Sequence, residues 1–163
     1  MSSTTLIPNL PDHSRVWIYT SSREFTESEI LEIEAVGKQF VETWRVHGSA
    51  MSAEFKIIYN RFVVIAADEQ VAGVSGCGID STVALMKQIE EKYSVVLLDK
   101  LNLAFHSVQN TIEVLPMMEF QNKMDQGGIH SQTIVFNNLV ETLGELRSSW
   151  EVPLKESWHK QLL

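Results

Sequence analysis

"EFKIIYNRFVVIAAD", residues 54–68, contains two runs of β-forming side chains that are separated by the polar pair Asn60 and Arg61. Two such runs with a short polar break are typical of an antiparallel hairpin. The second run is apolar at every position from Phe62 to Ala67, as expected of a strand that is covered on both faces. The sequence therefore predicts a hairpin whose second strand lies at the centre of a sheet.

A strand and a long helix are predicted before this hairpin. Residues 15–21, "RVWIYTS", alternate strongly enough to indicate a strand. Thr26 and Glu29 have the spacing of a capping box, in which two residues exchange hydrogen bonds at a helix start. Apolar side chains then follow on one helical face as far as Trp44.

Helices and strands also alternate after the hairpin. Asp80 or Ser81 is expected to cap a second helix, which ends near Ser94. Residues 101–108 and 111–117 flank a polar turn and predict a second pair of strands.

The last third of the chain is predicted to extend this core. Pro116 is expected to open a helix that two glycines end near residue 127. Residues 133–138 indicate a short strand, and residues 139–150 have helical spacing as far as the stop at Pro153.

The first six predicted elements have the order strand, helix, strand, strand, helix, strand. That order is typical of the ferredoxin-like fold, in which two helices cover one face of a sheet. We therefore predict an α+β protein with a ferredoxin-like (βαββαβ) two-layer core and a C-terminal β/α extension. Residues 1–14 are expected to form an irregular leader at the surface, and residues 15–163 a single domain.

The composition limits the classes of function. The chain of 163 residues has a net charge of −8, and its 13 basic side chains are dispersed, so nucleic-acid binding is not expected. No apolar run approaches the ~20 residues of a membrane span, and the N-terminus lacks a signal-peptide pattern. The single cysteine cannot form an intrachain disulfide. We therefore expect a cytoplasmic protein with no membrane or nucleic-acid partner.

Two segments, "FVVIAADE" and "VSGCG", look like motifs of ABC-transporter ATPases. A phosphate-binding loop, however, requires Gly, four residues, then Gly-Lys and a hydroxyl residue. The one Gly-Lys pair, Gly37–Lys38, has Glu32 at the first glycine position and Gln39 at the hydroxyl position. ATP hydrolysis is therefore not expected.

A wider resemblance rests on five segments: "WRVHGS", "IIYNRFVVIAADE", "SGCGIDS", "VFNNLVETLGEL" and "VPLKESWH". They resemble a family of short bacterial proteins of unknown function, some of which carry an ABC-transporter ATPase label. The similarity covers residues 16–159. No established activity of that family carries over to this chain, and the missing phosphate-binding loop argues against the ATPase label.

The glycine-rich stretch "GVSGCGIDST", residues 73–82, is the first candidate site. Backbone amides and hydroxyls at a helix start can bind an anion without any catalytic base. The candidate ligand-binding residues are Ser75, Gly76, Gly78, Asp80 and Ser81. The alternative is that the glycines only allow a tight connection from strand to helix, with Asp80 as a cap.

Cys77 in the same stretch gives an enzyme alternative. Before a helix start, the dipole can lower the pKa of a thiol and make it a nucleophile. His47 would then be the base, and amides around Gly78 would hold an oxyanion, as in a cysteine-dependent hydrolase or transferase. The structural alternative is a small, buried and inert cysteine in a tight turn.

No metal or other cofactor is expected, because the histidines and carboxylates lack the spacing of a metal site. The apolar tail with Trp158 and Leu162 is expected to cover its own core or that of a second copy, which would make a homodimer. The preferred function is a noncatalytic domain that binds a small anionic ligand or a protein through residues 73–81, and the alternative is the Cys77 enzyme.

Overall fold

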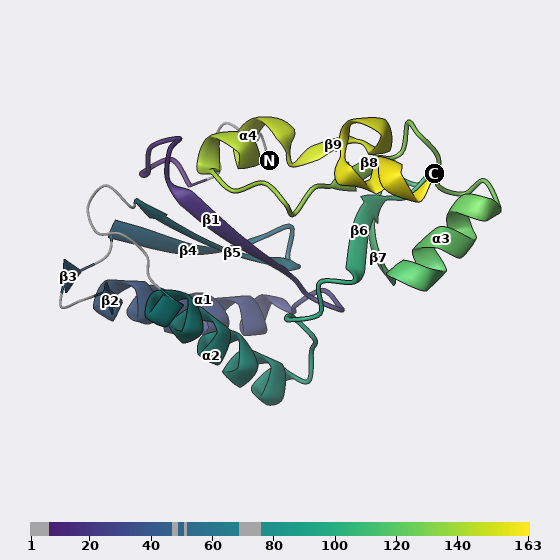
Figure 1. Cartoon of the computed structure of the whole chain (residues 1–163). Coiled ribbons are helices and arrows are strands. Elements are labelled where there is room, and N and C mark those ends of the chain that lie inside the picture. Colours follow the sequence, from purple (N-terminus) through teal and green to yellow (C-terminus); the bar gives the residue numbers. More distant parts are fainter. Residues whose placement is uncertain (1–6, 47–48, 51, 69–75) are drawn as a thin grey trace.

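The computed structural model describes residues 7–46, 49–50, 52–68 and 76–163, and two antiparallel sheets organise them (Figure 1). The first sheet has the order β1-β5-β4, with strands Arg15–Thr20, Phe62–Asp68 and Ser52–Ile58. The second has the order β7-β6-β8-β9, with strands Ile112–Pro116, Asn102–His106, Ile134–Phe136 and Glu151–Pro153. A two-residue pair, β2 (Arg45–Val46) and β3 (Ser49–Ala50), lies beyond the first sheet.

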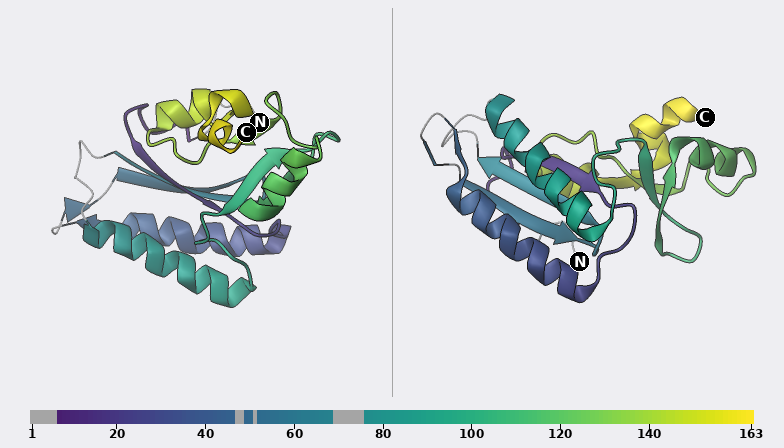
Figure 2. Two further views of the ribbon diagram at one scale, coloured as in Figure 1. Left: turned by 45° about the vertical axis from the view of Figure 1, so that its right-hand side comes forward. Right: turned by 90° about the horizontal axis from the view of Figure 1, so that it is seen from below.

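Helices cover both sheets. The α-helices are α1 (Glu27–Thr43), α2 (Gly76–Tyr93), α3 (Met117–Asp125) and α4 (Leu143–Ser149), and the 3-10 helices are η2 (Leu154–Glu156) and η3 (Trp158–Leu162). Helices α1 and α2 lie side by side on one face of the first sheet, and α4 lies on the opposite face (Figures 1 and 2). Helix α3 lies against the second sheet.

Strand β5 is the buried centre of the first sheet, as the apolar run predicted. All its residues from Phe62 to Ala67 are fully buried. Val63 and Ile65 pack against the side chains of α1 and α2, whereas Phe62 and Val64 pack on the α4 side. Because successive side chains of a strand point to opposite faces, both faces must be covered, and the run has no polar position.

The predicted hairpin is confirmed, with its turn one residue earlier than expected. Tyr59 and Asn60 form the turn with φ values of +55° and +59°, and Arg61 N donates to Ile58 O over 3.2 Å. Positive φ at both central residues gives the backbone twist that two-residue hairpins need. Tyrosine is unusual in this conformation, but its ring stacks on Trp150 with centroids 6.1 Å apart.

The capping box at the start of α1 is also confirmed. The Thr26 hydroxyl accepts from Glu29 N over 3.2 Å, and the Glu29 carboxylate accepts from Thr26 N over 2.9 Å. These bonds satisfy two backbone groups that have no partner within the helix.

The α+β class is confirmed, but the ferredoxin-like order is not. The β1-β5-β4 sheet with α1 between β1 and β4 corresponds to the first three strands of that fold. The fourth strand of the predicted order is β6, and it pairs with β7 and β8 in the second sheet. Leu103 and Phe105 of β6 pack on α3, where the rings of Phe105 and Phe120 have centroids 5.7 Å apart.

The last predicted helix, over residues 139–150, was too long. Helix α4 begins after Thr142, whose hydroxyl caps it by accepting from Glu145 N over 3.2 Å. The residues before it lie beside β1, where Val16 N donates to Glu141 O over 3.0 Å. This backbone pairing with an edge strand takes precedence over helical spacing.

The described part of the predicted leader, residues 7–14, forms no helix or strand, and it does not simply cover the surface. Ile7 and Leu10 are buried in the core between the first sheet and α4. The carbonyls of Asp12 and Ser14 accept hydrogen bonds from the first amides of α4, over 2.9 and 2.8 Å. The leader therefore supplies partners that a helix start lacks.

Candidate functional site

The glycine-rich stretch lies partly outside the described residues. Helix α2 begins at Gly76, so Gly76 and Gly78 belong to its first turn, and Ser75 lies outside the described residues. Asp80 and Ser81 are exposed residues within the helix, and the prediction that one of them caps it was wrong.

The early start of α2 is held in place by its contact with β1. The Thr82 hydroxyl donates to Ile79 O over 2.7 Å and lies 3.1 Å from the Tyr19 hydroxyl. Thr82 is buried, and its contact with Tyr19 anchors the first turns of α2 to the sheet. The helix therefore begins earlier than the predicted cap at Asp80 or Ser81. Neither contact involves the glycines, so the sequence pattern gave no sign of it.

The two predicted catalytic residues cannot be placed relative to each other. His47 and the side chain of Cys77 lie outside the described residues. The cysteine-dependent alternative therefore stays a prediction.

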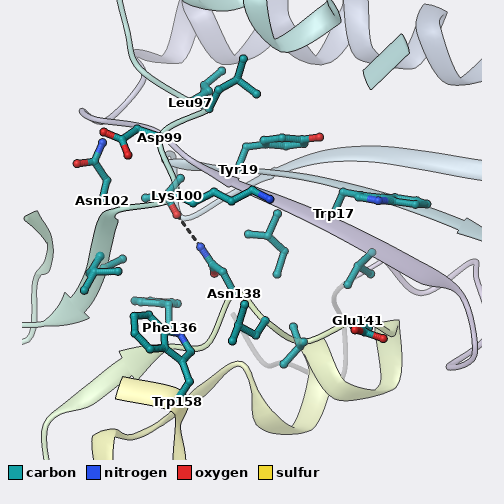
Figure 3. A pocket seen from close by; sticks show the side chains of 18 of the residues that line it. Trp17, Tyr19, Leu97, Asp99, Lys100, Asn102, Phe136, Asn138, Glu141 and Trp158 are labelled. Atoms are coloured by element: carbon teal, nitrogen blue, oxygen red, sulfur yellow. Dashed lines mark hydrogen bonds between the residues drawn. The ribbon is translucent and has the colours of Figure 1, made fainter. Parts of the chain in front are cut away.

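A different site lies where the two sheets meet, in a cavity of about 360 Å³ along the edge of β1 (Figure 3). All six residues of β1 line it, with Ile79 and Val83 of α2. The rest of the lining comes from distant segments of the chain: residues 97–100, 102–104, Phe136, 138–141 and 158–159.

Aromatic side chains lie on two sides of this cavity. Trp17 and Tyr19 project on the side of α1 and α2, and Phe136 and Trp158 line the opposite side (Figure 3). Aromatic rings provide a large apolar contact area with little loss of side-chain freedom on binding. The cavity is therefore shaped for an apolar or planar group.

The edge of β1 adds backbone polar groups. Val16 donates its N–H to Glu141 O, which lies on the side away from β5. Successive residues of a β-strand direct their backbone N–H and C=O groups to opposite edges. Ile18, two residues after Val16, therefore presents its N–H and C=O on the same edge as Val16. Within the described ranges, neither the N–H nor the C=O of Ile18 has a backbone hydrogen-bond partner on this edge.

Polar side chains in the lining are firmly positioned. Asn138 donates to the Thr20 hydroxyl over 2.8 Å, the dashed line in Figure 3, and accepts from Trp150 Nε1 over 2.9 Å. Charged residues of both signs surround the cavity: Arg15, Asp99, Lys100 and Glu141. These charges therefore do not by themselves favour an anionic ligand over a cationic one.

His159 is the one histidine of the described cavity lining, and it is only 1% exposed. Its Nδ1 atom lies 2.7 Å from the Ser157 hydroxyl oxygen, and its ring stacks on Trp158 at 4.1 Å. Burial lowers the pKa of His159 to about 4, so the ring is neutral at pH 7.

Neither a cluster of metal ligands nor a membrane-spanning helix occurs among the described residues. No group of three or more His, Cys, Asp or Glu side chains among them could hold a metal ion. Of the helices in this part of the chain, none has the length and apolar character needed to cross a membrane. Asp68 Oδ1, at the end of β5, lies 2.9 Å from His13 Nε2.

Known proteins give no further guide. Comparison of the chain with protein-family models, curated proteins and solved structures finds no match. The resemblance noted from sequence segments stays a prediction, and the site must be interpreted from its own geometry.

Sequence reasoning missed most of this site. The sequence patterns singled out none of His159, Asn102 and Asn138. The contact between Ser157 and His159 depends on a 3-10 turn, and a Ser-x-His spacing is no recognised motif. Trp158 and Leu162 of the same tail are half-buried against the chain's own core between the second sheet and α3, which includes Phe105 and Phe120.

Proposed function

We propose that this protein is a noncatalytic domain that binds a small organic molecule in the cavity along β1. The cavity of about 360 Å³ carries the proposal. Its volume falls within the range of roughly 300–1,000 Å³ that is usual for small-molecule sites. Its lining combines aromatic walls with a few polar groups that are fixed in place, which is the composition of such sites.

The positions of the polar groups support binding rather than group transfer. Asn138 is held by two hydrogen bonds, and His159 is neutral and bound to a buried hydroxyl. Groups of this kind orient a ligand. The hydroxyl beside His159 belongs to Ser157, which is 2% exposed and is not part of the cavity lining, so this pair does not present a nucleophile to a ligand.

A thermal-shift screen tests the proposal. A panel of aromatic carboxylates, amides, nucleotides and inorganic phosphate is added to the protein, and isothermal titration calorimetry follows any stabilisation. A true ligand at 100 times its Kd raises the free energy of unfolding by about 2.7 kcal/mol. Mass spectrometry of the recovered ligand should show it unchanged.

A variant that narrows the cavity provides the control. Ile79 lines the cavity and is 37% exposed, so Ile79→Trp adds bulk at its rim and should abolish binding. Val36 of α1 is 43% exposed and outside this lining, so Val36→Trp should bind like the wild type. Stabilisation by no compound, equal binding by Ile79→Trp, or conversion of the ligand would contradict the proposal.

A further inference from the structure

One ring nitrogen of His159 is left without a protein partner. Nδ1 is occupied by Ser157, whereas Nε2 has no hydrogen-bond partner among the described residues. The side chain is almost fully buried and lines the cavity. Nε2 is not among the unpartnered polar atoms of the described residues that are closed off from solvent, so this nitrogen is open to the cavity that His159 lines.

The partner of Nδ1 determines which nitrogen carries the hydrogen. Ser157 is 2% exposed, and its hydroxyl has His159 Nδ1 as its sole partner in the described part of the chain. If Nδ1 donated to the hydroxyl oxygen, the hydroxyl hydrogen would be buried without an acceptor. Donation from Ser157 to Nδ1 satisfies both groups, and it places the ring hydrogen on Nε2.

We infer that His159 Nε2–H donates a hydrogen bond to a carbonyl or carboxylate oxygen of the cavity's ligand, and that this ligand is a planar aromatic compound. The inference rests on the proposed function and specifies its ligand. A neutral N–H donor can pair with a neutral carbonyl oxygen or with a charged carboxylate oxygen. The aromatic side chains around the cavity can pack against the aromatic rings of such a ligand.

The same geometry disfavours an ammonium group at this position. An amine presents N–H donors to an N–H donor, so a bound amine would cut His159 Nε2 off from water without giving it an acceptor. A site that is built to bind one polar group rejects an analogue lacking it, because its own buried group is left unsatisfied. His159 therefore determines ligand specificity without any chemical step.

Three naphthalene probes test this inference by calorimetry: naphthoate, naphthamide and naphthylmethylamine. The wild type should bind the first two at least about tenfold more tightly than the amine, as expected for loss of a hydrogen bond in a buried site. The variant His159→Phe keeps an aromatic ring but lacks the donor, so its affinities for the three probes should agree within about twofold. His130→Phe, at an exposed site outside the cavity lining, should retain the wild-type preference.

A second measurement requires no variant of a buried residue. Two-dimensional NMR of the ¹⁵N-labelled imidazole in the wild type should show Nδ1 without hydrogen and Nε2 with it. The Nε2–H signal should shift when naphthoate is added. A hydrogen on Nδ1, an unchanged Nε2 signal with bound naphthoate, or equal binding of the amine would overturn the inference.

The two proposals fail in different ways. If wild type binds none of the three probes but binds another compound that Ile79→Trp excludes, the assigned ligand class is wrong and the cavity's function stands. If His159→Phe keeps the wild-type preference while Ile79→Trp blocks it, the cavity binds ligands without a bond from His159. If Ile79→Trp binds every compound as the wild type does, the ligand does not occupy this cavity and both proposals fail.

Discussion

Gly37 of α1 and Phe55 of β4 are in direct contact, and the phenyl ring occupies the space of a side chain at position 37. A Cβ atom on Gly37 would lie 2.2 Å from Phe55 Cδ1. Glycine in mid-helix costs about 1 kcal/mol relative to alanine, so this close approach explains its presence. The helix can lie directly on the edge strand because there is no side chain between them.

Gly37→Ala should therefore destabilise the protein although alanine favours helices. Displacing the Phe55 ring should cost about 1–3 kcal/mol. The higher helix propensity of alanine offsets about 1 kcal/mol of this cost, so the net loss of stability should be as much as about 2 kcal/mol. Urea unfolding followed by circular dichroism measures the net loss. Lys38→Ala, at the exposed neighbouring position, should change the free energy of unfolding by less than about 0.5 kcal/mol. A Gly37→Ala protein more stable than wild type would show that the ring moves freely.

Local signals in the sequence were enough to predict the three strands of the first sheet and the start of α1. The hairpin turn at Tyr59 and Asn60, the apolar run of β5 and the capping box at Thr26 all depend on neighbours within a few residues. Such features are decided by backbone sterics and by the period of hydrophobic residues, which a single sequence contains. The α+β class follows from them.

The second sheet and the cavity could not be predicted in this way. Strand β6 has the pattern of any half-buried strand, and its choice of β7 and β8 over β1 depends on packing against Phe120. The cavity joins β1, the 97–104 connection and η3, which are far apart in the sequence. No local pattern shows that His159 lines the same cavity as Tyr19.

The ion pair at the start of α1 should make stability depend on pH in acid. Two bonds of 2.9 Å join Arg23 to the Glu29 carboxylate, and Arg23 also donates to Tyr93 O at the end of α2. The hydrogen bonds from Arg23 and from the Thr26 amide lower the pKa of Glu29 to about 2.

A lowered carboxyl pKa stabilises the fold above the unfolded pKa of 4.5, and this stabilisation is lost as the pH falls toward 2. Glu29→Gln should thus be less stable than wild type at pH 7, with the difference shrinking between pH 5 and pH 2 in urea titrations. The control variant Glu27→Gln, in the same helical turn, should show the same pH dependence of stability as the wild type. A difference that is constant across this pH range would exclude the carboxylate charge as its cause.

The Tyr59 hydroxyl links the hairpin turn to the second sheet. It donates to Glu151 Oε2 over 2.7 Å, while His106 Nε2 lies 2.8 Å from Glu151 Oε1. Tyr59→Phe removes one bond to this carboxylate and should lower the free energy of unfolding by about 1–3 kcal/mol. Tyr93→Phe is the matched control, because its bond to Glu32 is exposed and should contribute less. Chemical unfolding measures the free energy of unfolding of both variants. An equal loss would show that the bond to Glu151 contributes no more than the exposed bond to Glu32.

Buried His159 should make the protein less stable in weak acid. Burial lowers its pKa from 6.5 to about 4, so between these values the unfolded chain binds a proton that the folded protein does not. Stability from this group is complete above pH 6.5 and falls as the pH decreases toward 4, by at most about 1.4 kcal/mol for each pH unit.

A glutamine at position 159 cannot take up that proton. Urea unfolding of His159→Gln should therefore show a shallower loss of stability than wild type between pH 6.5 and pH 4. His130→Gln, at an exposed position, should keep the wild-type slope. Equal slopes for wild type and His159→Gln would mean that His159 takes up its proton without unfolding. It would then be charged in acid, and the cavity would attract carboxylates more strongly than amides at low pH.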